Sequence, residues 1–302
     1  MIKKTLYFGN PCFINCKDLQ LIINKKSETG NSEETKIPIE DIGVVIVDHF
    51  GVALTQYSLS LLLENNVAVV ICNSSHLPAG MLLNLDGNAL QSEFFKNQVN
   101  ASVPLKKQLW QQTISYKISN QASLLKSIGK NSQNIFAWSE QVKSGDTSNL
   151  EARASAYYWK NLFSPEINFS RDRYGEPPNN LLNYGYAVLR AVVARSLVGS
   201  GLLPTLGIHH HNKYNAYCLA DDIMEPYRPF VDKIVLEITK EEKDISELNT
   251  NIKKKLLIIP TLDVYLDDER KPLMVAMHKT TASLAKCYSG EIKKIKYPEF
   301  SK

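Results

Sequence analysis

The hydrophobic period of this chain changes near residue 85, and this change is the strongest limit on how the chain can fold. Before it, residues 43–48 and 67–72 form continuous β-branched runs, which are typical of buried strands. Between these runs, the leucine spacing of residues 55–65 predicts one short helix with Thr55 as its N-cap. Further extended segments are expected at residues 5–11, 18–25, 36–39 and 80–84.

After residue 98 the apolar positions recur at helical spacing. The Pro- and Gly-containing segment 73–88 is where we place the connection between domains. We therefore expect an α+β chain, with a small mainly-β N-terminal domain with one helix at residues 1–85 and a larger all-α C-terminal domain at 86–302. Helices are predicted at residues 105–130, 148–163, 181–198, 214–239 and 269–293, and Pro226 and Pro229 are expected to kink the fourth of them.

The bulk composition is that of an ordinary globular protein and restricts function only weakly. The net charge of +4 is a mild basic bias that permits nucleic acid as a partner without requiring it. Five scattered cysteines, with no second close pair beside Cys12 and Cys16, argue against a disulfide framework and a four-ligand zinc site. Because we find no secretory signal and no apolar run of about 18 residues, we expect a cytoplasmic protein that contacts no membrane.

Acidic and imidazole groups concentrate in three places. Glu151 lies in the first turn of a predicted helix, where a carboxylate also compensates the helix dipole. His209, His210 and His211 are consecutive. Successive side chains of an extended segment point in opposite directions, so one of these histidines rather than all three is expected to bind a ligand. A run of solvated histidines is the alternative.

The third place is an acidic turn before two prolines. Asp222 and Glu225 are three residues apart and share a helix face, where two carboxylates repel each other unless a cation or a proton lies between them. A solvated turn in which Arg228 pairs with Glu225 is the alternative. Taken together, the carboxylates and one imidazole suit Mg²⁺ or Mn²⁺, and such a cation supports phosphodiester chemistry by polarising a phosphoryl oxygen.

The same acidic segment carries a resemblance to a known family. Residues 207–210 and 215–229 closely resemble the CRISPR adaptation integrases, which insert spacers, and especially their type II branch. The segments 43–48, 64–67, 76–80 and 120–122 also look like that family. The resemblance follows nearly the whole chain in order, and its longest segment is specific.

The resemblance implies a fold and a metal site. The family has an N-terminal β domain and a C-terminal helical catalytic domain, as the change of period predicts. Its metal site is a glutamate, a histidine and a second acidic residue, and by position these resemble Glu151, His210 and Glu225. His210 is chosen because the family's histidine lies fifteen residues before the last carboxylate. Asp222 matches a further acidic position near the metal, although Asp221 beside it is not excluded.

The resemblance also implies a reaction and a set of partners. In CRISPR adaptation, a form of antiviral defence, the 3′-hydroxyl of a short DNA fragment attacks a phosphodiester of the repeat beside a leader. The expected partners are the double-stranded fragment, the repeat and leader DNA, and a second copy of the chain joined through the N-terminal domain. A small CRISPR adaptation protein bridges two such dimers. Type II systems add a ring-forming DNA-binding protein and an RNA-guided effector nuclease.

Basic residues outside the acidic cluster are candidate contacts to DNA phosphates. Neutralised phosphates make binding fall steeply with salt, whereas a solvated basic face is the alternative for each residue singly. Tyr174, Tyr184 and Tyr186 are candidates for stacking on an unpaired base, with packing in the core as the alternative. The candidate phosphate contacts are Lys106, Lys107, Lys117, Arg153, Arg171, Arg173 and Arg190.

Two other functions fit parts of this pattern. A general metal-dependent DNA endonuclease would use the same metal ligands with water as the nucleophile. A non-catalytic DNA-binding scaffold would need only the basic residues, and it has no use for an acidic pocket near DNA.

Overall fold

The computed structural model describes residues 3–26, 32–74, 76–167 and 169–300, and it divides into two compact units. The first unit ends at Ala89 and the second begins at Leu90, a few residues after the change of hydrophobic period. None of the described helices combines the length and the apolar composition that a membrane crossing requires.

The first sheet of the N-terminal unit contains the two β-branched runs. Its order is β1-β5-β7-β8, in which β1 (Lys4–Phe8), β5 (Ile42–Val47) and β7 (Ala68–Cys72) run parallel. The last strand, β8 (Pro78–Leu82), is antiparallel to β7. All six residues of β5 are buried, which confirms the interpretation of the continuous apolar run as an interior strand.

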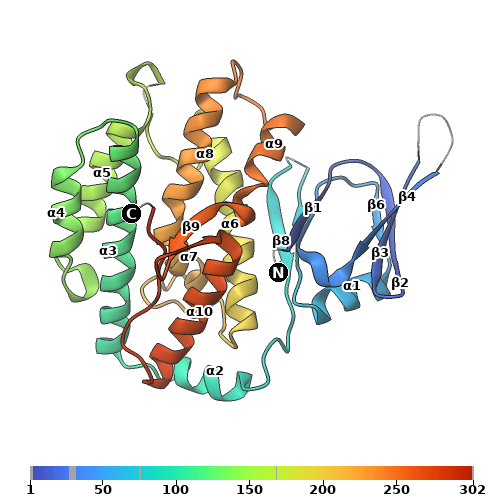
Figure 1. Ribbon diagram of the computed structural model, residues 1–302, viewed down its shortest axis with the longest axis horizontal. Helices are drawn as coiled ribbons and strands as arrows, with labels where there is room; N and C mark the ends of the chain where they lie inside the picture. Colours follow the sequence, from blue (N-terminus) through green and yellow to red (C-terminus); the bar gives the residue numbers. More distant parts are fainter. Residues whose placement is uncertain (1–2, 27–31, 75, 168, 301–302) are drawn as a thin grey trace. The chain divides into compact units, whose positions relative to one another are not determined.

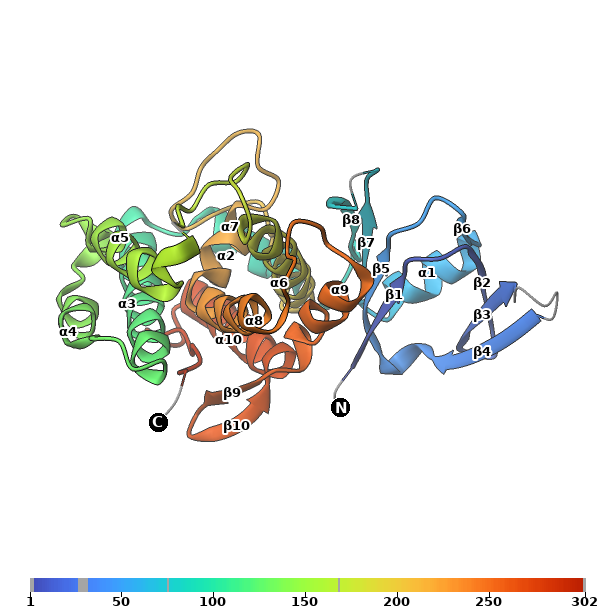
Figure 2. The same cartoon turned by 90° about the horizontal axis from the view of Figure 1, so that it is seen from above.

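The second sheet has the order β4-β3-β2-β6 (Figures 1 and 2). Its central strand β2, which lies between β3 and β6, was not predicted, because its mixed polarity hides the strand period. Helix α1 (Gln56–Glu64) begins where it was predicted, and the Thr55 side chain accepts a hydrogen bond from Ser58 N. The two sheets and α1 share one apolar core. The strands are β2 (Cys12–Lys17), β3 (Gln20–Lys26), β4 (Ser32–Pro38) and β6 (Val52–Leu54).

The C-terminal unit is helical, and together with the strand-rich first unit it confirms the α+β fold class. Three of its helices, α2, α4 and α9, were not predicted. Figure 1 shows the long helices lying side by side. Most residues of α6 are buried. The helices are α2 (Gln91–Val99), α3 (Val103–Ser127), α4 (Gln133–Gln141), α5 (Leu150–Leu162), α6 (Asn179–Gly199), α7 (Cys218–Met224), α8 (Arg228–Glu241), α9 (Thr250–Leu256) and α10 (Leu273–Ser289).

A short hairpin interrupts this helical unit where a helix was predicted to begin at residue 269. Strands β9 (Asp263–Leu266) and β10 (Glu269–Pro272) pair antiparallel, and α10 starts only after them. Asp267 and Asp268 both have positive φ, at 55° and 62°, which is the backbone of a tight two-residue turn. The C-terminal unit is therefore not purely α.

The functional candidates come from four segments of the C-terminal unit. These are the middle of α3, the start of α5, the loop before α7 together with α7 itself, and the 3₁₀ turn Glu225–Tyr227 between α7 and α8. The turn lies where Pro226 and Pro229 were predicted to interrupt the helical stretch. Helix α3 packs against α5, α7, α8 and this turn, so it holds the four segments together.

Candidate functional site

The first turn of α5 is fixed by an aspartate that precedes it. Asp146 Oδ1 accepts a hydrogen bond from Leu150 N at 2.9 Å, and its Oδ2 accepts one from Glu151 N at 3.0 Å. These bonds satisfy two of the free N–H groups at the helix start and hold the backbone that carries Glu151. Asp146 was missed in the sequence, although an acidic residue shortly before a helix is a signal for such a cap.

Replacing Asp146 by alanine is expected to lower the free energy of unfolding by about 1–2 kcal/mol, because two backbone donors lose their acceptor. Asp146→Asn keeps one acceptor oxygen and is expected to lose less. Urea unfolding of both variants checks this order. An Asp146→Ala protein as stable as Asp146→Asn would contradict the capping role.

Asp222 organises the histidine segment. Its carboxylate is fully buried and accepts backbone hydrogen bonds from Ile208 N at 2.7 Å, His209 N at 3.0 Å and His210 N at 3.3 Å. The tight path of the backbone around this carboxylate requires glycine at position 207, because a Cβ on Gly207 would lie 2.3 Å from the carbonyl oxygen of His210. Three converging N–H groups are the usual way to accommodate a buried carboxylate.

The same carboxylate orients the ring of His210. His210 Nδ1 lies 2.5 Å from Asp222 Oδ1, and this hydrogen bond raises the pKa of the imidazole although burial opposes it. The ring's Nε2 is then left for another partner, which is the arrangement that metal-binding histidines adopt. His209 instead stacks on Trp110, with ring centroids 4.2 Å apart. The two histidines therefore have different partners: His210 is oriented by Asp222, and His209 packs on Trp110.

Asp221 faces away from this arrangement. Its carboxylate pairs with Arg190 Nε at 2.6 Å and accepts a hydrogen bond from Asn215 Nδ2 at 2.7 Å. Of the two adjacent aspartates, Asp222 is the one that contacts His210.

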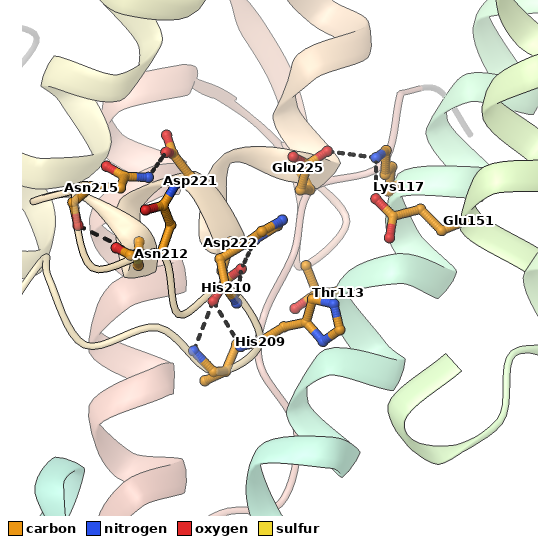
Figure 3. Close-up of polar contacts among 12 residues, drawn as sticks. Thr113, Lys117, Glu151, His209, His210, Asn212, Asn215, Asp221, Asp222 and Glu225 are labelled. Carbon is orange, nitrogen blue, oxygen red and sulfur yellow. Dashed lines mark hydrogen bonds and ion pairs between the residues drawn. The ribbon is translucent and has the colours of Figure 1, made fainter. Parts of the chain in front are cut away.

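Lys117 lies between the two candidate glutamates. Its Nζ is 2.6 Å from Glu151 Oε1 and 2.7 Å from Glu225 Oε2 (Figure 3). Arg228 Nε lies 2.9 Å from the other oxygen of Glu225, so the predicted alternative pairing of these two residues is present as well. Burial would lower the pKa of Lys117, but Glu225 and Glu151 outweigh it and raise that pKa. Burial would raise the pKa of Glu225, and Arg228 and Lys117 outweigh it and lower it.

The chemistry of these donors fits a divalent cation, but their present arrangement has Lys117 at the centre. Among the residues that the structure describes, no three His, Cys, Asp or Glu side chains are close enough to hold a metal. Glu151 and Glu225 nevertheless meet at one cationic atom, which is what two neighbouring carboxylates require. A metal between them therefore requires Lys117 to release at least one carboxylate.

The candidate DNA contacts fall into two groups. Lys107, Arg153 and Arg173 are exposed, and Lys106 is partly exposed. Arg190 and Arg171 are half-buried, Arg190 in its pair with Asp221 and Arg171 among asparagine side chains. The prediction that Lys117 is a surface phosphate contact is wrong, because its side chain is buried between two carboxylates. A buried lysine has the same sequence appearance as a solvated one, since its partners come from distant segments.

The three tyrosines predicted as stacking candidates differ in exposure. Tyr184 and Tyr186 are buried, as their alternative interpretation proposed, whereas Tyr174 is 90% exposed. Tyr214, in the loop after the histidines, is 85% exposed and has Lys213 over its ring, but it was not among the predicted candidates.

Asp232, on α8, is a further buried acid of the helical unit. Asp232 accepts hydrogen bonds from Tyr158 at 2.7 Å and Tyr186 at 2.5 Å. Burial raises its pKa to about 6, although both tyrosines and the nearby arginines oppose that rise. The folded protein therefore holds the Asp232 proton more tightly than the unfolded chain does.

This shift predicts a pH-dependent cost for Asp232→Asn. The stabilising contribution of Asp232 is fully present below its ordinary pKa of 3.8 and is lost as pH rises through about 6. We expect the loss of unfolding free energy in the variant to be roughly 2–3 kcal/mol larger near pH 4 than above pH 7. Urea unfolding of both proteins at the two pH values measures it, and an equal loss at both would contradict the assignment.

The fold and the site together define the class: a two-unit α+β protein whose helical unit holds an acidic, histidine-containing centre among basic side chains. Residues 6–271 match the family described as CRISPR associated protein Cas1. The chain therefore belongs to the Cas1 family. A curated relative, the CRISPR-associated endonuclease Cas1 of Neisseria meningitidis serogroup C (strain 8013), is 34% identical over 302 residues, covering 99% of this chain and 97% of its own.

Solved structures share the fold. A casposase bound to an integration product superposes with a TM-score of 0.78 at 20% identity, covering 99% of this chain and 93% of that one. A chain of a Cas6-RT-Cas1–Cas2 complex gives a TM-score of 0.72 at 20% identity, covering 97% of this chain and 36% of that one. At these identities the likeness extends to the arrangement of elements and not to individual side chains.

Proposed function

We propose that this protein is a metal-dependent DNA integrase of CRISPR adaptation. In the proposed reaction, the 3′-hydroxyl of a short DNA fragment attacks a phosphodiester of the repeat. The observation that carries the proposal is the meeting of Glu151 and Glu225 at one cationic atom. His210, with its Nδ1 engaged by Asp222, supplies the third donor. Family membership supports the assignment to CRISPR adaptation.

Glu151, Glu225 and the Nε2 of His210 are the donors that would hold Mg²⁺ or Mn²⁺. When bound, such an ion would neutralise charge on a phosphoryl oxygen and lower the pKa of the departing hydroxyl. Asp222 keeps the His210 ring in the tautomer that leaves Nε2 unprotonated. Because the pKa of His210 is raised, this donor becomes available only as pH rises through that value.

In the proposed site, Arg228 and Lys117 position and neutralise the glutamates and do not bind the metal. Arg228 holds one oxygen of Glu225 and leaves the other for the shared cation position. Lys117 neutralises the two carboxylates until a metal takes that position. We infer that metal binding and release of Lys117 are coupled, since both cations need the same oxygen atoms.

The partners are proposed from the known relatives. One structural neighbour is a casposase bound to an integration product, and another belongs to a Cas6-RT-Cas1–Cas2 complex. These support DNA and a small CRISPR adaptation protein as partners of this chain. The homodimer through the N-terminal unit, the type II ring-forming protein, the effector nuclease and the cytoplasmic location stay predictions.

A strand-transfer assay tests the proposed function. A labelled fragment with a free 3′-hydroxyl is incubated with a plasmid carrying a leader and a repeat, with Mg²⁺ or Mn²⁺ and separately with a chelator. We expect labelled plasmid only with the metal. Metal-dependent cleavage without joined product would instead favour the general endonuclease, the activity in the name of the Neisseria relative. No metal-dependent product of either kind would favour the non-catalytic scaffold.

A further inference from the structure

Asn120, on the long helix α3, is a buried amide that lies next to the glutamate pair. It is 1% exposed and follows Lys117 by three residues, so the two side chains share one face of the helix. Lys117 contacts the side chain of Glu225, and Asn120 contacts the backbone of the same 3₁₀ turn at Pro226. One face of α3 therefore holds this turn at two points.

The Asn120 amide has three backbone partners. Its Nδ2 donates to the carbonyl oxygen of Pro226 at 2.8 Å and to that of Pro298 at 3.0 Å. Its Oδ1 accepts a hydrogen bond from Phe300 N at 3.0 Å. Pro226 directly follows Glu225, whereas Pro298 and Phe300 lie near the end of the chain. Asn120 thus joins the turn that carries Glu225 to a C-terminal segment.

The carbonyl of Pro226 benefits from a donor on another helix. Pro226 is buried, and a buried backbone carbonyl needs a hydrogen-bond partner. In a 3₁₀ turn the donor would be the residue three positions further on. That residue is Pro229, which has no N–H group. Asn120 supplies the donor that this position lacks.

The C-terminal segment that holds Asn120, residues 293–300, is a strap bound to two other elements. Gln112 of α3 accepts a hydrogen bond from Ile295 N at 2.9 Å and donates to the carbonyl of Lys293 at 3.0 Å. Glu299 N donates to the carbonyl of Tyr265, on β9, at 2.8 Å. Figure 1 shows the end of the chain beside α3. The strap is therefore fixed before it reaches Asn120.

A second route connects the strap to the same turn. The hydroxyl of Thr280, on α10, donates to the carbonyl of Lys296 at 2.5 Å. Because that hydroxyl has only one proton, it accepts from the hydroxyl of Tyr227 at 2.7 Å. Tyr227 is the last residue of the turn, so two adjacent residues of the turn are each bonded to the strap through one intermediate side chain.

The orientation of Glu225 depends on this backbone. Its Oε2 lies 2.7 Å from Lys117 Nζ and its Oε1 lies 2.9 Å from Arg228 Nε, so both oxygens have defined directions. A functional side chain must be held to about 0.5 Å by the residues around it. A shift of the turn would change the position of both oxygens at once.

We propose that Asn120 is a positioning residue of the candidate centre, which fixes the backbone beside Glu225 and is itself fixed by the strap. Asn120 acts through Glu225 and touches neither the metal nor the DNA. The use of this position for metal binding rests on the proposed function, whereas the placement of Glu225 against Lys117 does not.

Asn120→Ala tests the proposal on the metal-dependent reaction, with Gln112→Ala as its matched control. The control removes two hydrogen bonds between the same helix and the same strap but leaves the contacts of the turn intact. We expect Asn120→Ala to weaken Mn²⁺ binding about tenfold and to lower kcat of strand transfer by a similar factor, with KM for DNA unchanged.

Gln112→Ala is expected to change neither Mn²⁺ binding nor kcat, although it destabilises the strap. Urea unfolding measures the stability of both variants, so that an effect on the centre can be separated from an effect on stability. Equal weakening of Mn²⁺ binding in the two variants, or wild-type binding in Asn120→Ala, would overturn the proposal.

A measurement without metal separates this proposal from the proposed function. The ¹⁵Nζ signal of Lys117 is followed by NMR in protein labelled at lysine and is assigned by its loss in Lys117→Met. We expect Asn120→Ala to shift this signal because Glu225 moves, and Gln112→Ala to leave it in place. An unshifted signal in Asn120→Ala would overturn the proposal, whereas a wild-type protein that binds no Mn²⁺ would refute the proposed function alone.

Two substitutions at Phe300 decide the matter if Asn120→Ala does not fold. Phe300→Pro removes the N–H group that Asn120 accepts, and Phe300→Ala keeps this N–H group while also removing the ring. We expect Phe300→Pro to weaken Mn²⁺ binding about threefold relative to Phe300→Ala and to shift the Lys117 signal further. Equal Mn²⁺ binding and equal Lys117 signals in the two variants would overturn the proposal.

Discussion

Glu151→Gln and His210→Gln are each expected to reduce strand transfer by about 10³-fold while leaving affinity for duplex DNA nearly unchanged. Each substitution removes one proposed metal donor, and the loss of roughly 4 kcal/mol of transition-state stabilisation corresponds to that factor. The candidate phosphate contacts Lys107, Arg153 and Arg173 are exposed to solvent and are not among the proposed metal donors. Initial rates of labelled-fragment joining and anisotropy titrations measure the two effects separately.

Glu140→Gln is the matched control for this pair. It removes an exposed glutamate on α4 that contacts none of the candidate donors, so strand transfer should be unchanged. Substantial joining by Glu151→Gln, or an equal loss in Glu140→Gln, would show that the proposed donors are not what the reaction depends on.

Lys117→Met is expected to have opposite effects on stability and on metal binding. Without metal, the variant leaves Glu151 and Glu225 without their shared cation, and removing one partner of a buried ion pair costs about 3–5 kcal/mol. The melting temperature should fall by about 5–10 °C. The variant also lacks the ammonium group that competes with Mn²⁺ for the carboxylate oxygens. We therefore expect Mn²⁺ to bind the variant at least about tenfold more tightly than it binds the wild type.

Calorimetric unfolding with and without Mn²⁺, together with Mn²⁺ titration calorimetry, measures both effects of Lys117→Met. Lys126→Met, in the last turn of the same helix, removes an exposed lysine and should change neither. Weaker Mn²⁺ binding by Lys117→Met would mean that the ammonium assists the metal instead of competing with it.

Those parts of the fold that depend on local pattern could be predicted from the sequence. The buried strands β5 and β7, helix α1 with its Thr55 cap, and the interruption at Pro226 all follow from spacing and turn chemistry within a few residues. The strand β2 and the hairpin β9–β10 escaped prediction. In both, the apolar period is short or mixed, and what defines them is pairing with a neighbouring strand.

The residues of the candidate site came from the sequence and their role as metal donors stays a prediction, whereas their contacts could not be predicted. Glu151, His210 and Glu225 were chosen by chemistry and resemblance, and the structure gives each a defined partner. The position of Lys117 was not predictable, because its two partners lie 34 and 108 residues away in the sequence. The contacts of Asp222 with the histidine segment could not be predicted either, because its partners are backbone N–H groups, which every residue type except proline carries.

The origin of the oxygen atoms at the cut phosphodiester tests the central claim most directly. The reaction is carried out in water enriched in ¹⁸O, with the labelled fragment and the repeat-bearing plasmid, and the phosphate at the target position is analysed by mass spectrometry. Attack by the fragment's 3′-hydroxyl predicts that this phosphate joins fragment to repeat and contains no ¹⁸O. A 5′-phosphate that carries ¹⁸O, with no fragment attached, would contradict the account and identify water as the nucleophile.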